Sequence, residues 1–458
     1  MQFLGLNIPV KNVPELDPSF IPLQKFNEAF LAGAKQPVGI AVERAGGEMA
    51  SVKTFIYGTE EMRAADRYYI DRLVKTLLWM KGGFRVYVSG SEDIYTYLKE
   101  DLYRDGGKQD FDYHYFSEVF EHPFEIVLTD KLPENADSPK KIGGHLGGCR
   151  IGFDAGGSDR KVSAVIDGET VYSEEVVWYP KLSEDPTYQF NGIVEAFKTA
   201  ASKMPRVDGI GVSSAGVFVG NAPMVSSLFI KVPRERREEV KTVYDRAAKE
   251  IGENVPIVVA NDGDVTALAG SMSLDSGRVM GLAMGTSEAV GYVDENRDIL
   301  GWYNELAFAP VDLAEDAMRD EWSGDIGVGC KYFSQDAVIK LAPAAGIGLA
   351  PELSPAEKLK EVQKLAAIGS KEAEKIFLSI GCYLAHTLAL YSRFYDLKYL
   401  LVLGRVASGL GGETIVAECR RVLADEYPAL AEKIDVTLPD EKFRRVGQSM
   451  AAASLPRI

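Results

Sequence analysis

The sequence has few cysteines, no excess of positive charge and no long apolar run. Its four cysteines, spread over 458 residues without a CxxC spacing, argue against a disulfide framework and offer no obvious zinc ligand set. The net charge of −16 argues against nucleic acid as a partner, because phosphate contacts need a basic face. No stretch approaches the roughly 20 apolar residues that cross a bilayer, and the N-terminus lacks a secretory pattern. We therefore expect a cytoplasmic protein that does not bind membranes.

A stretch rich in glycine, proline and polar residues divides the chain. It covers residues 133–148, reads PENADSPKKIGGHLGG and has the composition of a flexible connector. On both sides of it, short apolar segments alternate with amphipathic ones, which indicates an α/β fold with largely buried strands. We expect helices over 59–80, where Thr59 would be the N-cap, over 190–203 and over 233–252.

Three loops that are rich in glycine or small residues each follow an expected strand. They read DAGGS at 154–158, GTS at 285–287 and GRVASGLGG at 404–412. Any one of them is more often a simple turn, but their order suits a nucleotide held between two α/β domains, which needs phosphate loops from both. Asp154 would repel a phosphate, so its place in the first loop makes sense if Mg²⁺ or its waters lie between them.

The segment VVANDGD places two further polar residues, Asn261 and Asp262, at the end of an apolar strand. Open α/β sheets bind ligands at the carboxyl ends of their strands. An asparagine can both donate to and accept from a hydroxyl, and Asp262 could accept the proton of a hydroxyl that attacks phosphorus. An Asx turn that caps the next helix explains the same pair equally well.

From about residue 149 to the end, these motifs resemble the ROK family of sugar kinases and sugar-binding repressors, in the actin/hexokinase/Hsp70 superfamily. IGFDAGGSDRKVSAVID and MGLAMGTSEAVGYV resemble its two phosphate loops, and VVANDGDVTALAG its catalytic Asn-Asp segment. GIGVSSAG resembles the turn that lines the sugar, and NELAFAPV resembles the segment that supplies a sugar-binding glutamate. LLVLGRVA resembles the strand and turn on the adenosine side, and GQSMAAA resembles the closing helix. The resemblance covers roughly two thirds of the chain.

The resemblance implies two actin-like ATPase (ribonuclease H-like) α/β lobes with a cleft between them, plus an N-terminal α/β domain. The accessory domain with its linker would cover 1–148, the first lobe 149–270 plus about 441–458, and the second lobe 271–440. The order of elements expected in the accessory domain fits either a degenerate actin-like half or an unrelated α/β domain.

The activity implied by the resemblance is ATP- and Mg²⁺-dependent phosphorylation of a sugar or sugar-derivative hydroxyl. Asp262 would be the general base, and Asp154 would serve the Mg²⁺ through ATP. The residues implied to bind the sugar are Asn261, Glu305, Ser214 and Gly216. Those implied to bind the nucleotide are Asp154, Gly156, Gly157, Ser158, Gly285, Thr286, Ser287, Gly404 and Arg405.

The sequence also departs from the family pattern. Phe308 replaces a sugar-binding histidine, and in GVGCKYFSQDAV only Cys330 remains of the zinc cysteines, with Tyr332 at a glutamate position. We therefore expect no zinc site and a changed sugar pocket, in which ring stacking could replace polar contacts. The alternatives are a non-catalytic sugar sensor and a superfamily phosphotransferase that acts on an acid or a polyol. The sequence leaves the sugar unidentified and a homodimer open.

Overall fold

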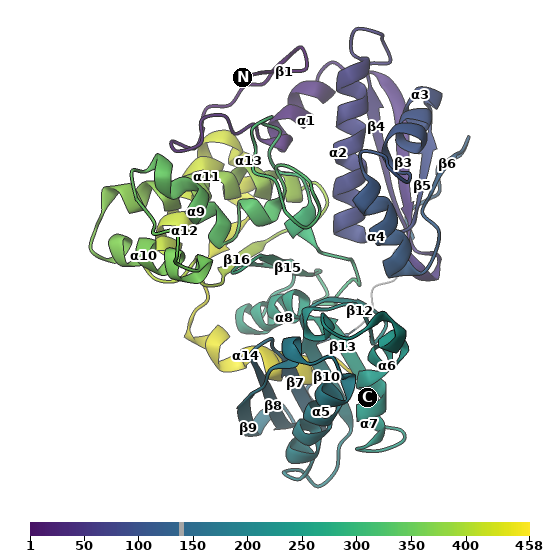
Figure 1. The fold of residues 1–458 in the computed structure, drawn as a ribbon, viewed down its shortest axis with the longest axis vertical. Helices are drawn as coiled ribbons and strands as arrows, with labels where there is room; N and C mark the ends of the chain where they lie inside the picture. Colours follow the sequence, from purple (N-terminus) through teal and green to yellow (C-terminus); the bar gives the residue numbers. More distant parts are fainter. Residues whose placement is uncertain (137–141) are drawn as a thin grey trace. The chain divides into compact units, whose positions relative to one another are not determined.

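The computed structural model describes residues 1–136 and 142–458, so residues 137–141 of the expected linker lie outside the described part. The chain forms two compact units, and each is described by itself (Figure 1). The first unit comprises Met1–Ser138, Leu282–Val290 and Trp302–Leu438, and the second comprises Pro139–Gly281, Gly291–Gly301 and Pro439–Ile458. The N-terminal domain therefore belongs to the same unit as most of the predicted second lobe.

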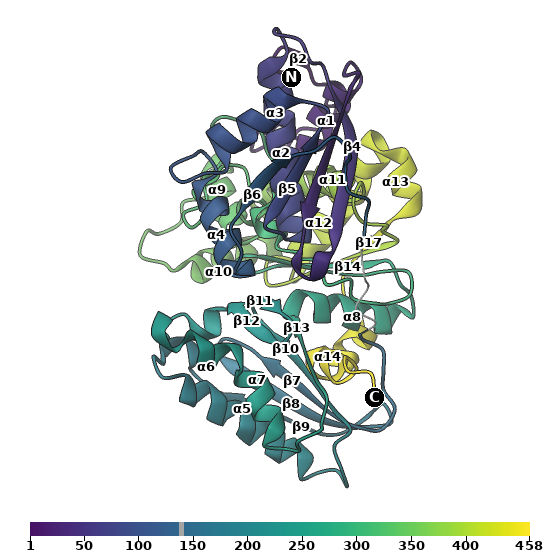
Figure 2. The ribbon, with the colours of Figure 1, turned by 90° about the vertical axis from the view of Figure 1, so that its right-hand side faces the viewer.

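The second unit is built on a five-stranded sheet in the order β13-β10-β7-β8-β9. Strands β7, β10 and β13 are parallel, whereas β8 and β9 continue the sheet antiparallel. Figure 2 shows α5 and α7 on one face of this sheet and α8 and α14 on the other. The bounds are β7 Cys149–Ala155, β8 Asp159–Ile166, β9 Glu169–Val177, β10 Gly209–Ser214, β13 Ile257–Asn261, α5 Pro186–Ala201, α7 Val243–Lys249, α8 Asp262–Leu274 and α14 Glu441–Ala453.

Two glycines let the last helix of the chain approach this sheet closely. A Cβ atom added to Gly152 of β7 or to Gly211 of β10 would collide with the backbone carbonyl of Ser449 or Ala452 in α14. Glycine allows such backbone-to-backbone contact because it has no side chain. The C-terminal helix is thus packed against the middle of two central strands.

The N-terminal domain of the first unit has a four-stranded sheet in the order β4-β3-β5-β6. Its bounds are β3 Gln36–Glu43, β4 Met49–Ile56, β5 Arg85–Ser89 and β6 Glu125–Leu128, with α2 Arg63–Lys81 and α4 Asp110–Phe120. Strand β3 pairs antiparallel with β5, whereas β7 and β10 of the second unit are parallel. The observed topology therefore fits an unrelated α/β domain better than a degenerate actin-like half.

The rest of the first unit contains most of a second four-stranded sheet, β15-β14-β16-β17, with a layer of helices in which α11 packs along α12. Residues 279–281 of β14 and 291–293 of β15 belong to the second unit. These elements are β14 Val279–Met284, β15 Glu288–Val293, β16 Tyr399–Leu403, β17 Asp435–Thr437, α11 Lys371–Tyr391 and α12 Leu410–Glu426. The remaining elements are β1 Gln2–Phe3, β2 Leu6–Asn7, α1 Leu23–Leu31, α3 Glu92–Thr96, β11 Val217–Val219, β12 Ala222–Val225, α6 Arg237–Lys241, α9 Gln335–Ala344, α10 Pro355–Ala367 and α13 Pro428–Lys433. None of the helices in the described part is long and apolar enough to cross a membrane.

Two of the expected helices differ in the structure. Thr59 is not an N-cap, because α2 begins at Arg63 and the backbone before it forms turns. The segment expected as one helix over 233–252 is interrupted at Thr242, whose hydroxyl donates to the carbonyl of Glu238 at 3.2 Å. Such back-bonding to a carbonyl four residues earlier competes with the helical hydrogen bond and bends helices.

Candidate functional site

The first group of candidate residues lies at the carboxyl ends of three parallel strands. Asp154 of β7 is in register with Ser213 of β10, and Ser214 is in register with Asn261 of β13. Because neighbouring parallel strands end at the same edge, Asp154, Ser214, Asn261 and the following Asp262 share that edge of the sheet. The structure thus brings together the residues expected for catalysis and for the metal side.

Asn261 fixes the turn that carries Asp262. Its side-chain carbonyl accepts from the Gly263 backbone N–H at 2.7 Å, and its amide donates to the Gly216 carbonyl at 2.8 Å. Asn261 is therefore the N-cap of α8, as in the Asx-turn alternative, and also ties β13 to the turn after β10. Asp262 is the first residue of the helix and is half-buried. Burial raises its pKa, against a hydrogen bond from the Gly263 N–H.

Asp154 has a strongly perturbed carboxyl group. Burial raises the pKa of Asp154 to about 6, against a hydrogen bond from Ser213, and the negative charge of Asp262 adds to the rise. Two neighbouring carboxylates that disfavour each other's ionisation are typical of sites that bind a cation or move a proton. The arrangement is compatible with either role.

The polar groups of Ser214 and Gly216, which were expected to line the sugar, form hydrogen bonds within the protein. The Ser214 side chain is fully buried, and its hydroxyl accepts from the Tyr244 hydroxyl at 2.9 Å. Gly216 has a φ of 130°, and its carbonyl is bound by Asn261. Both residues therefore brace the strand ends.

The first glycine loop joins β7 to β8 and is bounded by polar contacts. The Trp178 indole donates to the Gly156 carbonyl at 2.7 Å, and the Ser158 hydroxyl donates to Asp159 at 2.9 Å. A Cβ atom on Gly157 would come within 2.8 Å of the Lys181 amine. A positive charge therefore lies over the glycine turn, where an anion would be attracted.

The second and third loops lie side by side within the first unit. Gly404 lies so close to Met284 that a Cβ atom would collide with its backbone, and the Val406 N–H donates to the Met284 carbonyl at 3.0 Å. Thr286 and Ser287 are exposed, as are Gly404 and Arg405, and half-buried Gly285 donates its N–H to the Ser287 carbonyl at 3.0 Å. These five predicted nucleotide residues thus form a second group.

Glu305 lies in the first unit, on the N-terminal domain. Its backbone N–H donates to the Trp79 carbonyl at 3.0 Å, and the Asn304 N–H donates to the Met80 carbonyl at 3.0 Å. The last carbonyls of a helix have no partner within the helix, so this segment supplies partners for the end of α2. The position of Glu305 therefore depends on the domain that the sequence suggested was accessory.

The strand-end group also contains residues that the sequence analysis did not select. The Gln448 amide donates to Ser213 at 3.0 Å and to the backbone carbonyl of Asp262 at 2.6 Å, and its carbonyl accepts from Thr266 at 3.1 Å. Its motif, GQSMAAA, gave only the closing helix. Lys181 lies within a 3₁₀ turn, Pro180–Leu182, outside every motif, and no sequence signal marked it.

The segment around Cys330, where we expected no zinc site, is held in place by the ion pairs of a lysine. The Lys331 amine lies 2.6 Å from Glu321, 2.8 Å from Asp336 and 3.7 Å from Asp320. Neighbouring Cys330 is buried, and burial raises the pKa of its thiol. A buried ammonium with several carboxylates can organise a loop without a metal ion.

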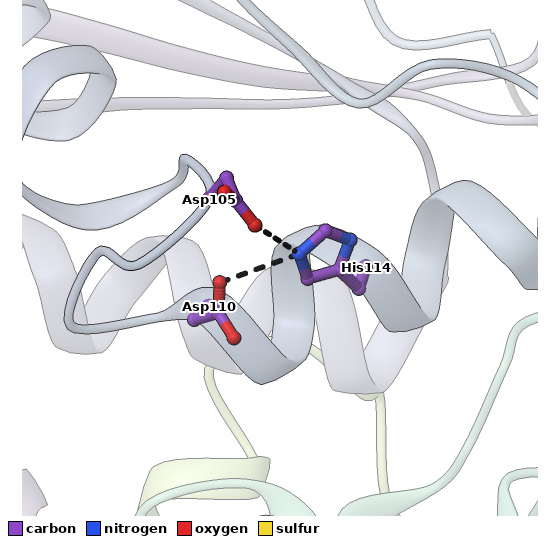
Figure 3. A group of neighbouring side chains, drawn as sticks. All are labelled: Asp105, Asp110 and His114. Atoms are coloured by element: carbon purple, nitrogen blue, oxygen red, sulfur yellow. Dashed lines mark hydrogen bonds and ion pairs between the residues drawn. The ribbon is translucent and has the colours of Figure 1, made fainter.

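One exposed cluster in the N-terminal domain has side chains of types that bind metals. Figure 3 shows Asp105 and Asp110 directed at the same ring nitrogen of His114, at 3.0 and 3.3 Å. Asp105 and His114 are exposed and Asp110 is half-buried. Because the three side chains satisfy one another at the surface, their contacts need no ion to explain them.

The strand order of the second unit is that of an actin-like fold, and its strand ends carry Asp154 and the Asn261–Asp262 pair. The structure is similar to a ROK hexokinase from Thermus thermophilus, with 17% identity, a TM-score of 0.51 and coverage of 67% of this chain and 96% of that one. It is similarly close to a ROK family transcriptional regulator, a homologue of the E. coli MLC protein, with 17% identity, a TM-score of 0.52 and coverage of 68% and 78%. No protein-family model and no curated protein matches the sequence. The chain has the ROK fold, as the resemblance predicted.

Proposed function

We propose that the protein is a ROK-type kinase that transfers a phosphoryl group from ATP to a hydroxyl of a sugar or sugar derivative. The observation that carries this proposal is the position of Asp262 at the end of β13, beside Asp154 and braced by Asn261 and Gln448. A half-buried carboxylate with a raised pKa is suited to accept a proton near neutral pH.

In this proposal, Asp262 accepts the proton of the acceptor hydroxyl as its oxygen attacks phosphorus. Asn261 keeps the Asp262 backbone in place through its contacts with Gly263 and Gly216. Gln448 holds the same turn from α14, because its amide binds the carbonyl of Asp262. Glu305 accepts hydrogen bonds from other acceptor hydroxyls.

The residues present suit ATP bound together with Mg²⁺. In this proposal ATP supplies the phosphoryl group. Asp154 has the carboxylate that a magnesium ion or its waters prefer, and its partly buried position beside Asp262, where burial raises its pKa, supports this role, because a cation there would offset two neighbouring negative charges. The Gly156–Gly157 turn under Lys181 would approach one part of the phosphate chain. The exposed Thr286–Ser287 loop and the Gly404–Arg405 loop would serve the rest of the nucleotide.

The test is ADP release with ATP, Mg²⁺ and a panel of sugars and amino sugars. Replacing Asp262 by alanine is expected to lower turnover by roughly 10²–10⁴-fold, the usual contribution of a general base. The matched control is Asp275→Asn at the other end of α8, where the side chain is 81% exposed and asparagine tolerates the left-handed backbone. Unchanged turnover in Asp262→Ala would refute the assignment.

A sugar sensor without phosphoryl transfer is the second candidate. Its support is the loss of polar groups from the acceptor side, where Phe308 replaces a histidine and Ser214 is fully buried. The same panel separates the two candidates, because a sensor binds a sugar without releasing ADP.

A further inference from the structure

The C-terminal end of α2 controls the segment that contains Glu305. The carbonyls of Trp79 and Met80 accept from the N–H groups of Glu305 and Asn304. The Trp79 ring also contacts Phe308 with ring centroids 4.8 Å apart. The N-terminal domain therefore sets both the backbone and the packing of the predicted acceptor segment.

Four aromatic side chains continue from this segment to the surface, and we call them the aromatic wall. The Trp322 ring lies 4.8 Å from Phe308, 4.8 Å from Phe111 and 5.3 Å from Tyr115, measured between ring centroids. Phe111 and Tyr115 come from α4, whereas Phe308 and Trp322 come from the second lobe. Trp322 is 49% exposed, so about half of this large side chain is accessible to solvent.

The charge around Glu305 limits the class of acceptor. Glu288 is 4% exposed, and its Oε2 has no hydrogen-bond partner among the described residues. Burial raises the pKa of Glu288 to about 8, against a hydrogen bond from Tyr391, and the charge of Glu305 adds to the rise. A region in which a second carboxylate stays protonated at neutral pH also disfavours an anionic ligand.

We propose that the N-terminal domain forms one side of the acceptor site and that the acceptor is an uncharged glycoside whose aglycone or second ring stacks on Trp322. The sugar hydroxyls bind Glu305, and the aromatic wall contacts the attached group. One exposed ring and three half-buried ones in the same cluster as a carboxylate suit such a ligand, because a sugar derivative presents both apolar faces and hydroxyls. This inference rests on the proposed function, which assigns Glu305 to the acceptor.

The test is calorimetric binding to the full-length protein without nucleotide, so that its outcome does not depend on turnover. The probes are glucose, mannose and N-acetylglucosamine, the phenyl β-glycoside of each, and gluconate. We expect a phenyl glycoside to bind roughly three- to tenfold more tightly than its free sugar, the range expected for one aromatic contact, and gluconate not to bind.

Trp322→Ala is expected to remove this preference, and Trp322→Phe to retain most of it. Phe55→Ala is the matched control, because Phe55 is a 47% exposed ring on β4 of the N-terminal domain, outside the aromatic wall. Equal binding of glycosides and free sugars, no glycoside binding, tight gluconate binding, or an unchanged preference in Trp322→Ala would each overturn the proposal. Glycoside binding without ADP release would contradict the kinase assignment and leave the aromatic wall supported.

Discussion

Replacing Asp154 by asparagine is expected to stabilise the protein at neutral pH while abolishing phosphoryl transfer. The pKa of this carboxyl rises from 3.8 to about 6 in the folded state, mainly through burial. Because the folded state binds the proton more tightly than the unfolded state, this group lowers the free energy of unfolding as pH rises from about 4 to about 6. At 1.36 kcal/mol per pKa unit, the full effect above that window is about 3 kcal/mol.

Urea unfolding of wild type and Asp154→Asn between about pH 4 and pH 8 measures this effect. The variant is expected to gain up to about 3 kcal/mol at pH 7 and to lose most of this advantage near pH 4, where the wild-type carboxyl is protonated in the folded state and about half protonated in the unfolded state. Asp275→Asn, which changes an exposed carboxylate, is the control and should follow the wild-type curve. A variant that is less stable than wild type at pH 7, or a constant difference across this pH range, would show that the carboxylate is not destabilised where it stands.

Three further outcomes are expected. Lys75→Met should destabilise the protein by about 3–5 kcal/mol in urea unfolding, because it leaves the buried carboxylate of Asp112, 2.7 Å from the Lys75 amine, without its partner; a loss below about 1 kcal/mol would contradict this. Gly211→Ala should cost about 1–3 kcal/mol through its collision with Ala452, and an unchanged thermal midpoint would show that α14 can move away freely. Elemental analysis should find no stoichiometric zinc, because the Lys331 amine already neutralises its carboxylates, and one zinc per chain would contradict that account.

The strand-end group was accessible from the sequence because its signal is local. An apolar strand that ends in a polar residue places that residue at the end of the strand, and this rule put Asp154 and Asn261 each at such an end. The shared edge came from the strand registers of the structure. The roles of these residues stay predictions. The glycine loops were also recognisable from local sequence. Loop 404–412 contacts Met284, the residue just before loop 285–287. The order of the loops along the chain could not predict this contact.

The predictions that were wrong depended on competing contacts along the backbone. Thr59 had the residue type of an N-cap, but α2 begins at Arg63, and the Asp66 carboxylate accepts from the backbone N–H groups of Tyr57 and Gly58 at 2.8 Å each. The hydrogen bond from Thr242 to a backbone carbonyl similarly interrupts a sequence with good helical periodicity. Helix propensity and capping rules consider a segment without hydrogen bonds between its backbone and side chains such as those of Asp66 and Thr242. They therefore misplace the ends and breaks of helices.

The attachment of the N-terminal domain could not be predicted because it depends on contacts between distant parts of the chain. Lys75 of α2 is fully buried and pairs with both Asp112 of its own domain and Asp325 of the second lobe. Such a cluster is stable only when every charge has its partner, because desolvated ions otherwise cost several kcal/mol. A displaced domain would leave the buried Lys75 with Asp112 alone and would break its pair with Asp325. The cluster therefore favours one docked arrangement, and the same arrangement places the end of α2 against Glu305. The domain is thus packed against the segment that we propose binds the acceptor.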